Sequence, residues 1–186
     1  MKTYAASASL QLLILSVMEK VYMDIPVKED NCGINMSYNF VSKTIGYDPK
    51  RLVSAHQEMA PFCSLQTYVK TITLHELGHA LDQKALDASL TRTLEIFTMK
   101  KNYSMRQIFS KPELFAMLIE EHEMNIAFEE TAWVNAAALN ERFHIVNFDD
   151  FEVIRKMSLA TYKKLYLEAV KLCEKLLSVQ KVDPVA

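Results

Sequence analysis

His75 and His79 stand four residues apart, and Glu76 directly follows the first of them. In an α-helix, residues i and i+4 lie on the same face, so both imidazole rings can reach one metal ion. Zinc binds neutral imidazole nitrogen, and a carboxylate beside the metal can take a proton from water. The spacing is therefore typical of a helical zinc site, with His75 and His79 as ligands and Glu76 as the base.

The segment around these histidines has the pattern of a helix whose buried face carries the motif. Ser64 is a suitable N-cap for a helix over residues 65–87. One stripe of this helix would contain Leu65, Tyr68, Val69, Ile72, His75, Glu76 and His79. Gly78 costs a helix interior roughly 1 kcal/mol relative to alanine, in a chain with only three glycines. Its position predicts that another segment approaches this turn closely. The alternative is an ordinary pair of core histidines without metal.

A hydrolytic zinc ion usually has three protein ligands, so a third must come from elsewhere in the chain. A long helix predicted over residues 112–142 carries the acidic candidates. Its phase places Glu129 between Ile126 and Trp133 on a face expected to be buried, where a carboxylate needs a partner. Glu130 and Glu123 lie on a neighbouring stripe and rank second and third.

We expect different roles for three other residues of this helix. Glu120 and Glu121 fit a solvated acidic face. His122 shares the face of Glu129 and could bind metal, donate a proton or simply pack.

The remaining pattern predicts an α+β fold that is mostly α, with a small antiparallel sheet packed on the motif helix. Expected helices cover residues 7–23, 49–58, 89–101 (capped by Ser89), 104–109 and 158–180, the last amphipathic. A short strand is expected at residues 25–28. Residues 34–40 and 44–47 should form a β-hairpin.

Length and composition restrict the class of protein. A chain of 186 residues suits one domain, residues 1–186. A net charge of −2 argues against nucleic-acid binding. The apolar run at residues 10–17 is too short for a membrane span. It resembles a weak signal-peptide core, but Gln11 and Ser16 interrupt it and no small-x-small cleavage pattern follows. Cys32, Cys63 and Cys173 are odd in number and widely spaced, which fits a reducing compartment. A cytoplasmic protein is expected.

Residues 74–82, Leu-His-Glu-Leu-Gly-His-Ala-Leu-Asp, resemble the active-site helix of gluzincin metallopeptidases. The resemblance is to compact zincins such as the anthrax lethal factor catalytic domain and phage-repressor-cleaving metallopeptidases. Residues 129–133 resemble the glutamate-x-x-alanine pattern of their second helix, which would make Glu129 the ligand. Trp133 stands where several gluzincins keep an aspartate that supports a histidine ligand. Asp82 is a candidate for that support.

The resemblance implies a minimal zincin-like domain and a zinc metalloendopeptidase. Zn²⁺ would be the cofactor, held by His75, His79 and Glu129, and Glu76 would activate zinc-bound water against a protein or peptide substrate. Tyr103, His122 and His144 are possible transition-state donors. The hairpin edge at residues 44–47 could pair with an extended substrate. The alternative function is a non-catalytic regulatory or protein-binding module of zincin fold with structural zinc.

Overall fold

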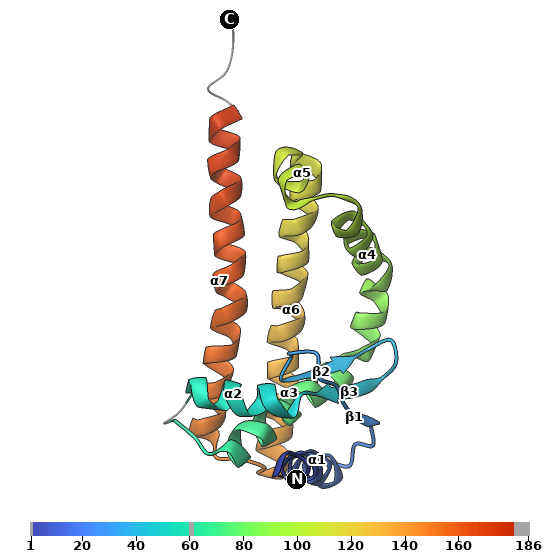
Figure 1. The fold of residues 1–186 in the computed structure, drawn as a ribbon, viewed down its shortest axis with the longest axis vertical. Helices are drawn as coiled ribbons and strands as arrows, with labels where there is room; N and C mark the ends of the chain where they lie inside the picture. Colours follow the sequence, from blue (N-terminus) through green and yellow to red (C-terminus); the bar gives the residue numbers. More distant parts are fainter. Residues whose placement is uncertain (1, 60–61, 181–186) are drawn as a thin grey trace, which may run out of the picture. The chain divides into compact units, whose positions relative to one another are not determined.

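The computed structural model describes residues 2–59 and 62–180, which are mostly helical with one small sheet (Figure 1). The helices of this described part are α1 (Lys2–Lys20), α2 (Pro49–Met59), α3 (Leu65–Leu81), α4 (Gln83–Asn102), α5 (Met105–Ser110), α6 (Pro112–Phe143) and α7 (Phe148–Gln180). The strands are β1 (Val27–Glu29), β2 (Met36–Asn39) and β3 (Thr44–Tyr47). The predicted α+β, mostly α class is confirmed.

The chain forms two compact units. Unit 1 consists of Met1–Asp87 and Glu129–Met157, and unit 2 consists of Ala88–Phe128 and Ser158–Ala186. The expectation of a single domain over residues 1–186 concerns cooperative folding and stays a prediction. Both histidines of the motif and Glu129 belong to unit 1.

The sheet of unit 1 has the strand order β1-β3-β2. The predicted hairpin is confirmed, with Tyr38 opposite Ile45 in an antiparallel pair. At its turn, the Asn39 side chain accepts hydrogen bonds from the backbone N–H groups of Val41 and Ser42, as asparagine commonly does in turns. The sheet is mixed rather than antiparallel throughout, because β1 runs parallel to β3.

The central position of β3 corrects one expectation. Residues 44–47 were expected to offer an edge to an extended substrate, but β3 is hydrogen-bonded to β1 on one side and to β2 on the other. A strand paired on both sides has no backbone groups left for another chain. The edges of this sheet are β1 and β2, and β2 packs against α3.

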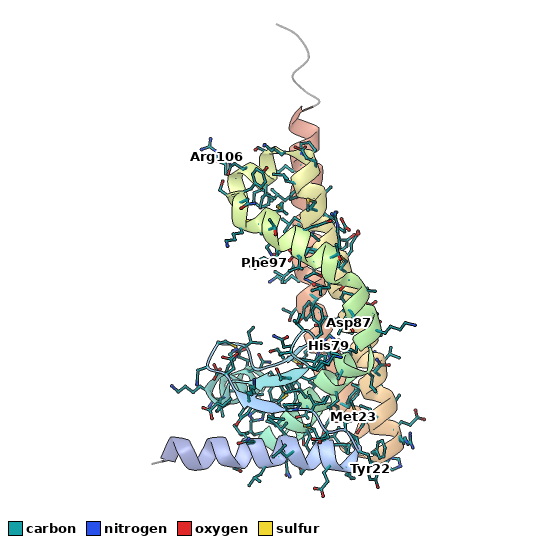
Figure 2. All side chains as sticks on the ribbon, turned by 90° about the vertical axis from the view of Figure 1, so that its right-hand side faces the viewer. Tyr22, Met23, His79, Asp87, Phe97 and Arg106 are labelled. Atoms are coloured by element: carbon teal, nitrogen blue, oxygen red, sulfur yellow. The ribbon has the colours of Figure 1, made fainter. Side chains whose placement is uncertain are left out.

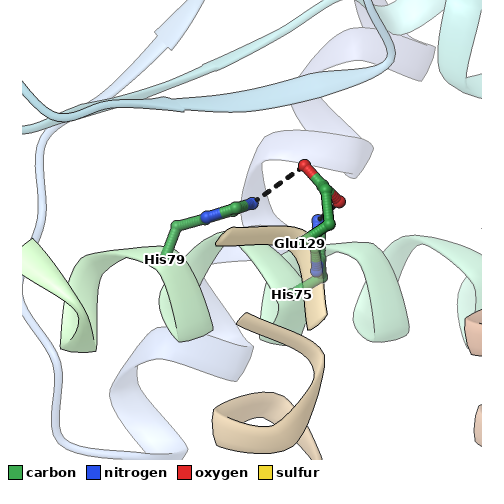
Figure 3. Close-up of side chains that lie close together, drawn as sticks. All are labelled: His75, His79 and Glu129. Carbon is green, nitrogen blue, oxygen red and sulfur yellow. Dashed lines mark ion pairs between the residues drawn. The ribbon is translucent and has the colours of Figure 1, made fainter. Parts of the chain in front are cut away.

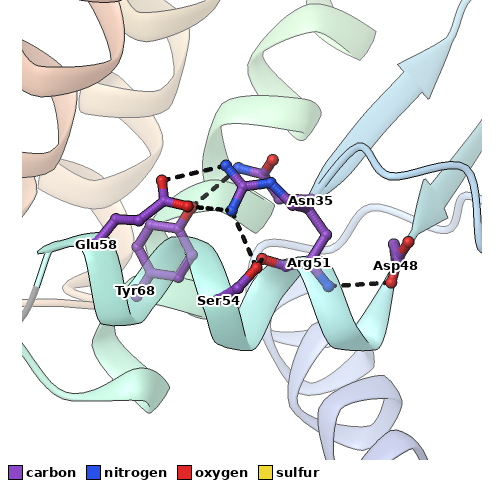
Figure 4. A network of polar contacts seen from close by, with 6 residues as sticks. All are labelled: Asn35, Asp48, Arg51, Ser54, Glu58 and Tyr68. Carbon is purple, nitrogen blue, oxygen red and sulfur yellow. Dashed lines mark hydrogen bonds and ion pairs between the residues drawn. The ribbon is translucent and has the colours of Figure 1, made fainter.

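A polar network joins the hairpin to α2 and α3 (Figure 4). The buried Asp48 side chain accepts hydrogen bonds from the backbone N–H groups of Lys50 and Arg51, at the start of α2. The bond from the Arg51 N–H contributes most to holding the pKa of the Asp48 carboxyl below its usual value, against the raising effect of burial, and the N–H groups of Gly33 and Lys50 add to it. Asn35 donates to the hydroxyl of Tyr68 on α3 at 2.9 Å. The network fixes the loop before β2 relative to the motif helix.

α3 begins as predicted and ends earlier. Ser64 caps it by accepting a hydrogen bond from Thr67 N. The expected extension to residue 87 is wrong, because the helix stops at Asp82, whose N–H bonds to the carbonyls of His79 and Ala80. Ser89, expected to cap the next helix, lies inside α4. Residues 71–78 are all buried, so α3 is a central helix rather than an amphipathic one, and α1 packs along it.

Unit 2 has its own core. The buried residues of this core are Ile96, Met99, Ile108, Phe115 and Leu118. Phe97, labelled in Figure 2, lies on α4 and is largely exposed. α7 contributes to unit 2 from Ser158 onwards, but the helix itself begins at Phe148, ten residues before the predicted start at 158.

Among the described residues, no helix is long and apolar enough to cross a membrane.

Candidate metal centre

Three side chains from two helices of unit 1 converge (Figure 3). His75 and His79, one turn apart on α3, have ring centroids 4.6 Å apart. Glu129 on α6 places Oε2 3.1 Å from His75 Nε2 and Oε1 3.3 Å from His79 Nε2. Each residue offers a ligand atom within 4.8 Å of the other two. The structure therefore brings together the two predicted histidines and the glutamate that ranked first.

Gly78 allows α6 to lie this close to α3. A Cβ atom built at Gly78 would stand 2.1 Å from the carbonyl oxygen of Ala132, well inside van der Waals contact. Asn135, six residues after Glu129 on α6, donates from Nδ2 to the Gly78 carbonyl at 3.0 Å. The expectation that another segment approaches this turn is confirmed. The contact between α3 and α6 at Gly78 therefore determines how closely Glu129 approaches the two histidines.

The electrostatics of the group favour an ionised glutamate. Burial of Glu129 would raise the pKa of its carboxyl, but the close approach and charge of His75 and His79 outweigh burial and bring the pKa to about 2. For His79, burial acts to lower the pKa, while Glu129, Glu76 and Asp82 raise it above the ordinary value. A carboxylate that draws positive charge onto its neighbours is also a good partner for a metal cation.

The three residues fit a divalent metal ion. Glu129 Oε2 is buried and accepts no hydrogen bond, although His75 Nε2 lies 3.1 Å away. Buried acceptors without a partner are rare in proteins, and an ion is one of the groups that satisfies them. Two imidazole nitrogens and a carboxylate oxygen form a donor set that zinc accepts readily. The group could therefore hold a metal ion.

Glu76 lies beside this group and is held by the sheet. Its Oε2 accepts a hydrogen bond from the backbone N–H of Tyr38 on β2 at 2.7 Å. Burial raises the pKa of the Glu76 carboxyl above its usual value, against the lowering effects of His75, His79 and the Tyr38 N–H. A carboxylate with raised proton affinity is better suited to accept a proton than an exposed one.

Trp133 is a part of the site that sequence reasoning did not assign. Its ring is fully buried and stacks on the His75 imidazole, with centroids 4.3 Å apart and planes inclined by 21°. The available signal was its spacing, because Trp133 follows Glu129 by four residues on the same face of α6. The Tyr38 N–H was also missed, since a backbone donor leaves no trace in residue type.

The competing glutamates lie outside the group. Glu130 is exposed on a neighbouring face of α6. Glu123 belongs to unit 2 and accepts a hydrogen bond from the Tyr166 hydroxyl. Glu120 and Glu121 are half-buried and pair with Arg92 and Lys100, so they form ion pairs rather than an open acidic face.

The side chains proposed from the sequence as proton donors lie apart from the group of His75, His79 and Glu129 in sequence. His122 and Tyr103 belong to unit 2, and Tyr103 lies beneath the Lys111 ammonium there. His144 is exposed just after α6. Their roles as proton donors stay predictions. Asp82 ends α3 and acts on His79 through its charge.

Comparison with known proteins finds no match, whether with family models, curated proteins or solved structures.

Proposed function

We propose that this protein is a zinc metalloendopeptidase of the gluzincin type. The observation that carries the proposal is the placement of Glu76. This buried carboxylate is next in sequence to His75, in a helix whose two histidines meet Glu129. A site meant only to hold a metal has no need of a further buried acid beside it, and burying one is costly.

The chemistry divides between the metal and the chain. When bound, zinc supplies Lewis-acid chemistry by acidifying water and polarising a carbonyl. Glu76 accepts the proton of the attacking water, a transfer that its raised pKa favours, and then gives the proton to the leaving amine. The Tyr38 N–H keeps the carboxylate in place during both transfers. His75, His79 and Glu129 would hold the metal, and Glu76, next to His75 in sequence, would act on the water beside it.

The number of ligands supports catalysis over the alternative of a structural zinc module. Structural zinc is closed by four protein ligands, whereas catalytic zinc keeps one position open. The metal-binding group found among the described residues has three members. We propose a protein or peptide as the substrate and the cytoplasm as the location, the latter because three widely spaced cysteines fit a reducing compartment.

Zinc content and hydrolysis of an unfolded protein such as casein test this proposal together. Glu76→Gln should retain zinc and lose about 100-fold or more in rate, because a positioned base contributes roughly 10²–10⁴-fold. His79→Ala should lose both zinc and hydrolysis. Elemental analysis and a cleavage assay on the same preparations measure the two properties.

The matched controls use neighbouring glutamates. Glu129→Ala should lose zinc, while Glu130→Ala, which removes an exposed carboxylate from the same helix, should keep it. Zinc retained in the Glu129 variant contradicts the ligand assignment. Full hydrolysis by the Glu76→Gln variant contradicts the catalytic role and favours the structural module.

A further inference from the structure

The buried polar atoms behind the metal centre raise the question of what holds the His75 ring in place. A metal-binding histidine usually donates its second ring N–H to a carboxylate or carbonyl, which fixes the plane of the ring. His75 Nδ1 is buried and has no hydrogen-bond partner. The orientation of this ring therefore depends on its other contacts, which are Glu129 Oε2 3.1 Å from Nε2 and a contact against the plane of the ring.

Trp133 provides that contact. The near-parallel stack covers one face of the imidazole, and rotation of His75 would drive its ring edge into the indole. Trp133 is itself fixed from another side, because Phe151 of α7 meets it edge to face, with centroids 5.6 Å apart and an angle of 75°. Both aromatic residues are fully buried.

The same turn of α6 delivers both the ring and the third ligand. Trp133 lies four residues after Glu129, so the two side chains share one helix face. The crossing of α6 over α3 at Gly78 then places Glu129 opposite His75 Nε2 and Trp133 against the plane of the same imidazole. One helix position thus determines where the ligand atom of His75 points.

We propose that Trp133 is a positioning residue for the metal centre: by stacking, it orients His75 before the metal binds, in the role that a hydrogen-bond acceptor at Nδ1 ordinarily has. This inference rests on the proposed metal site. The competing explanation is that Trp133 only fills the core of unit 1. A core residue affects the stability of the fold, whereas a positioning residue also affects metal affinity and ligand geometry.

The test compares two variants at residue 133 in the full chain. Trp133→Phe keeps an aromatic face against His75, and Trp133→Leu keeps apolar bulk without one. Zn²⁺ affinity is measured by competition with a chelator, and the visible spectrum of bound Co²⁺ reports ligand geometry. Leu52→Ala, which opens the core of unit 1 at the fully buried Leu52 of α2, is the control for lost stability alone.

Trp133→Leu should bind Zn²⁺ roughly 10–100-fold more weakly, as for other changes behind a metal ligand, and should alter the Co²⁺ spectrum. Trp133→Phe and Leu52→Ala should remain near wild type in both properties. Unchanged affinity and spectrum in Trp133→Leu would overturn the positioning role while leaving the peptidase proposal intact. A wild-type protein that binds no zinc would instead overturn the proposed function.

A measurement on the wild-type chain covers the case in which Trp133→Leu does not fold. Protons of the His75 ring that lie over the indole should have upfield-shifted NMR signals because of the indole ring current. The shift should be present both with Zn²⁺ and after removal of metal by chelator. Loss of the shift in the metal-free protein would show that the stack follows metal binding, which overturns the proposal.

Discussion

At the scale of single residues, position 78 has no space for a side chain and therefore requires glycine. Its missing side chain leaves space for the backbone carbonyl of Ala132, 2.1 Å from where a Cβ would stand. Helix propensity alone would favour alanine there by about 1 kcal/mol. The steric term acts in the opposite direction and is larger, because the obstructing atom is backbone and cannot rotate away.

Gly78→Ala should therefore destabilise the protein by a net of about 1–3 kcal/mol, the usual cost of overpacking a core. Displacement of α6 should also move Glu129 away from the histidines and weaken zinc binding by roughly tenfold or more. Chemical denaturation and zinc competition measure the two effects.

Gly46→Ala is the matched control. A Cβ at Gly46 would meet its nearest neighbours, the Asp30 Cβ and the Ser37 Oγ, at 3.7 Å, which is ordinary contact. This variant should keep wild-type stability and zinc affinity. Equal tolerance of alanine at both glycines would contradict the proposed crossing of α3 and α6.

The sequence indicated the three residues that the structure brings together, with Glu129 ranked above Glu130 and Glu123, because helical periodicity is local. The spacing of His75 and His79, and the phase of Glu129 between Ile126 and Trp133, follow from 3.6 residues per turn. The stack of Trp133 on His75 was not predictable, because it depends on where two helices distant in sequence cross. Gly78 indicated that a crossing exists, but not which residue of α6 would meet it.

At the scale of elements, β2 does more than complete the sheet. It is an edge strand, and its Tyr38 N–H points away from β3 to Glu76. The opposite residue in β3, Ile45, directs its own N–H to the Pro26 carbonyl on the far side. Tyr38 and Ile45 therefore form a pair without mutual backbone hydrogen bonds.

This geometry allows one hydrogen bond to be removed without breaking the sheet. Tyr38→Pro lacks the backbone N–H, and proline is tolerated on an edge strand when its nitrogen faces outward. The variant should retain zinc while hydrolysis falls about 10- to 100-fold, because small displacements of a catalytic group have effects of that order. Zinc analysis and the cleavage assay give the comparison.

Tyr38→Ala separates the backbone effect from the side-chain effect. Both variants lose the hydrogen bond from the Tyr38 hydroxyl to Gln83, but only the proline variant loses the N–H. Equal rates in the alanine and proline variants would show that the backbone bond to Glu76 has no part in catalysis.

Element boundaries were predictable where a residue type marks them. Ser64 and Pro49 mark the starts of α3 and α2, and both were found. The break at Asp82 was missed because neither glycine nor proline is present and the helical pattern continues into α4. The early start of α7 was missed for a similar reason. Asn147 Oδ1 accepts hydrogen bonds from the backbone N–H groups of Asp149 and Asp150 at this start, and the sequence pattern does not distinguish such a cap from a loop.

At the scale of the whole molecule, the three candidate metal ligands all come from one unit. They lie in the two chain segments, Met1–Asp87 and Glu129–Met157, that make up unit 1. A metal that binds only the folded state adds about 2.7 kcal/mol of stability at a free concentration 100 times its dissociation constant. This stabilisation should act on unit 1.

Removal of zinc by chelator should therefore speed hydrogen exchange in unit 1 far more than in unit 2. Mass spectrometry of peptides from α3 and from α5 compares the two units, and the α5 peptide, beside the unit 2 core at Ile108, serves as the internal control. Equal acceleration in both peptides would contradict the prediction. That result would indicate that the units unfold together as a single domain.

The aromatic composition of the chain gives the site an optical label of its own. Trp133 is the only tryptophan among 186 residues, beside eight tyrosines. Excitation at the red edge of the protein absorption band therefore yields emission from a single indole that touches the His75 ring. Events at the centre can be followed by intrinsic fluorescence in the unmodified protein, without a dye, a tag or an engineered chromophore.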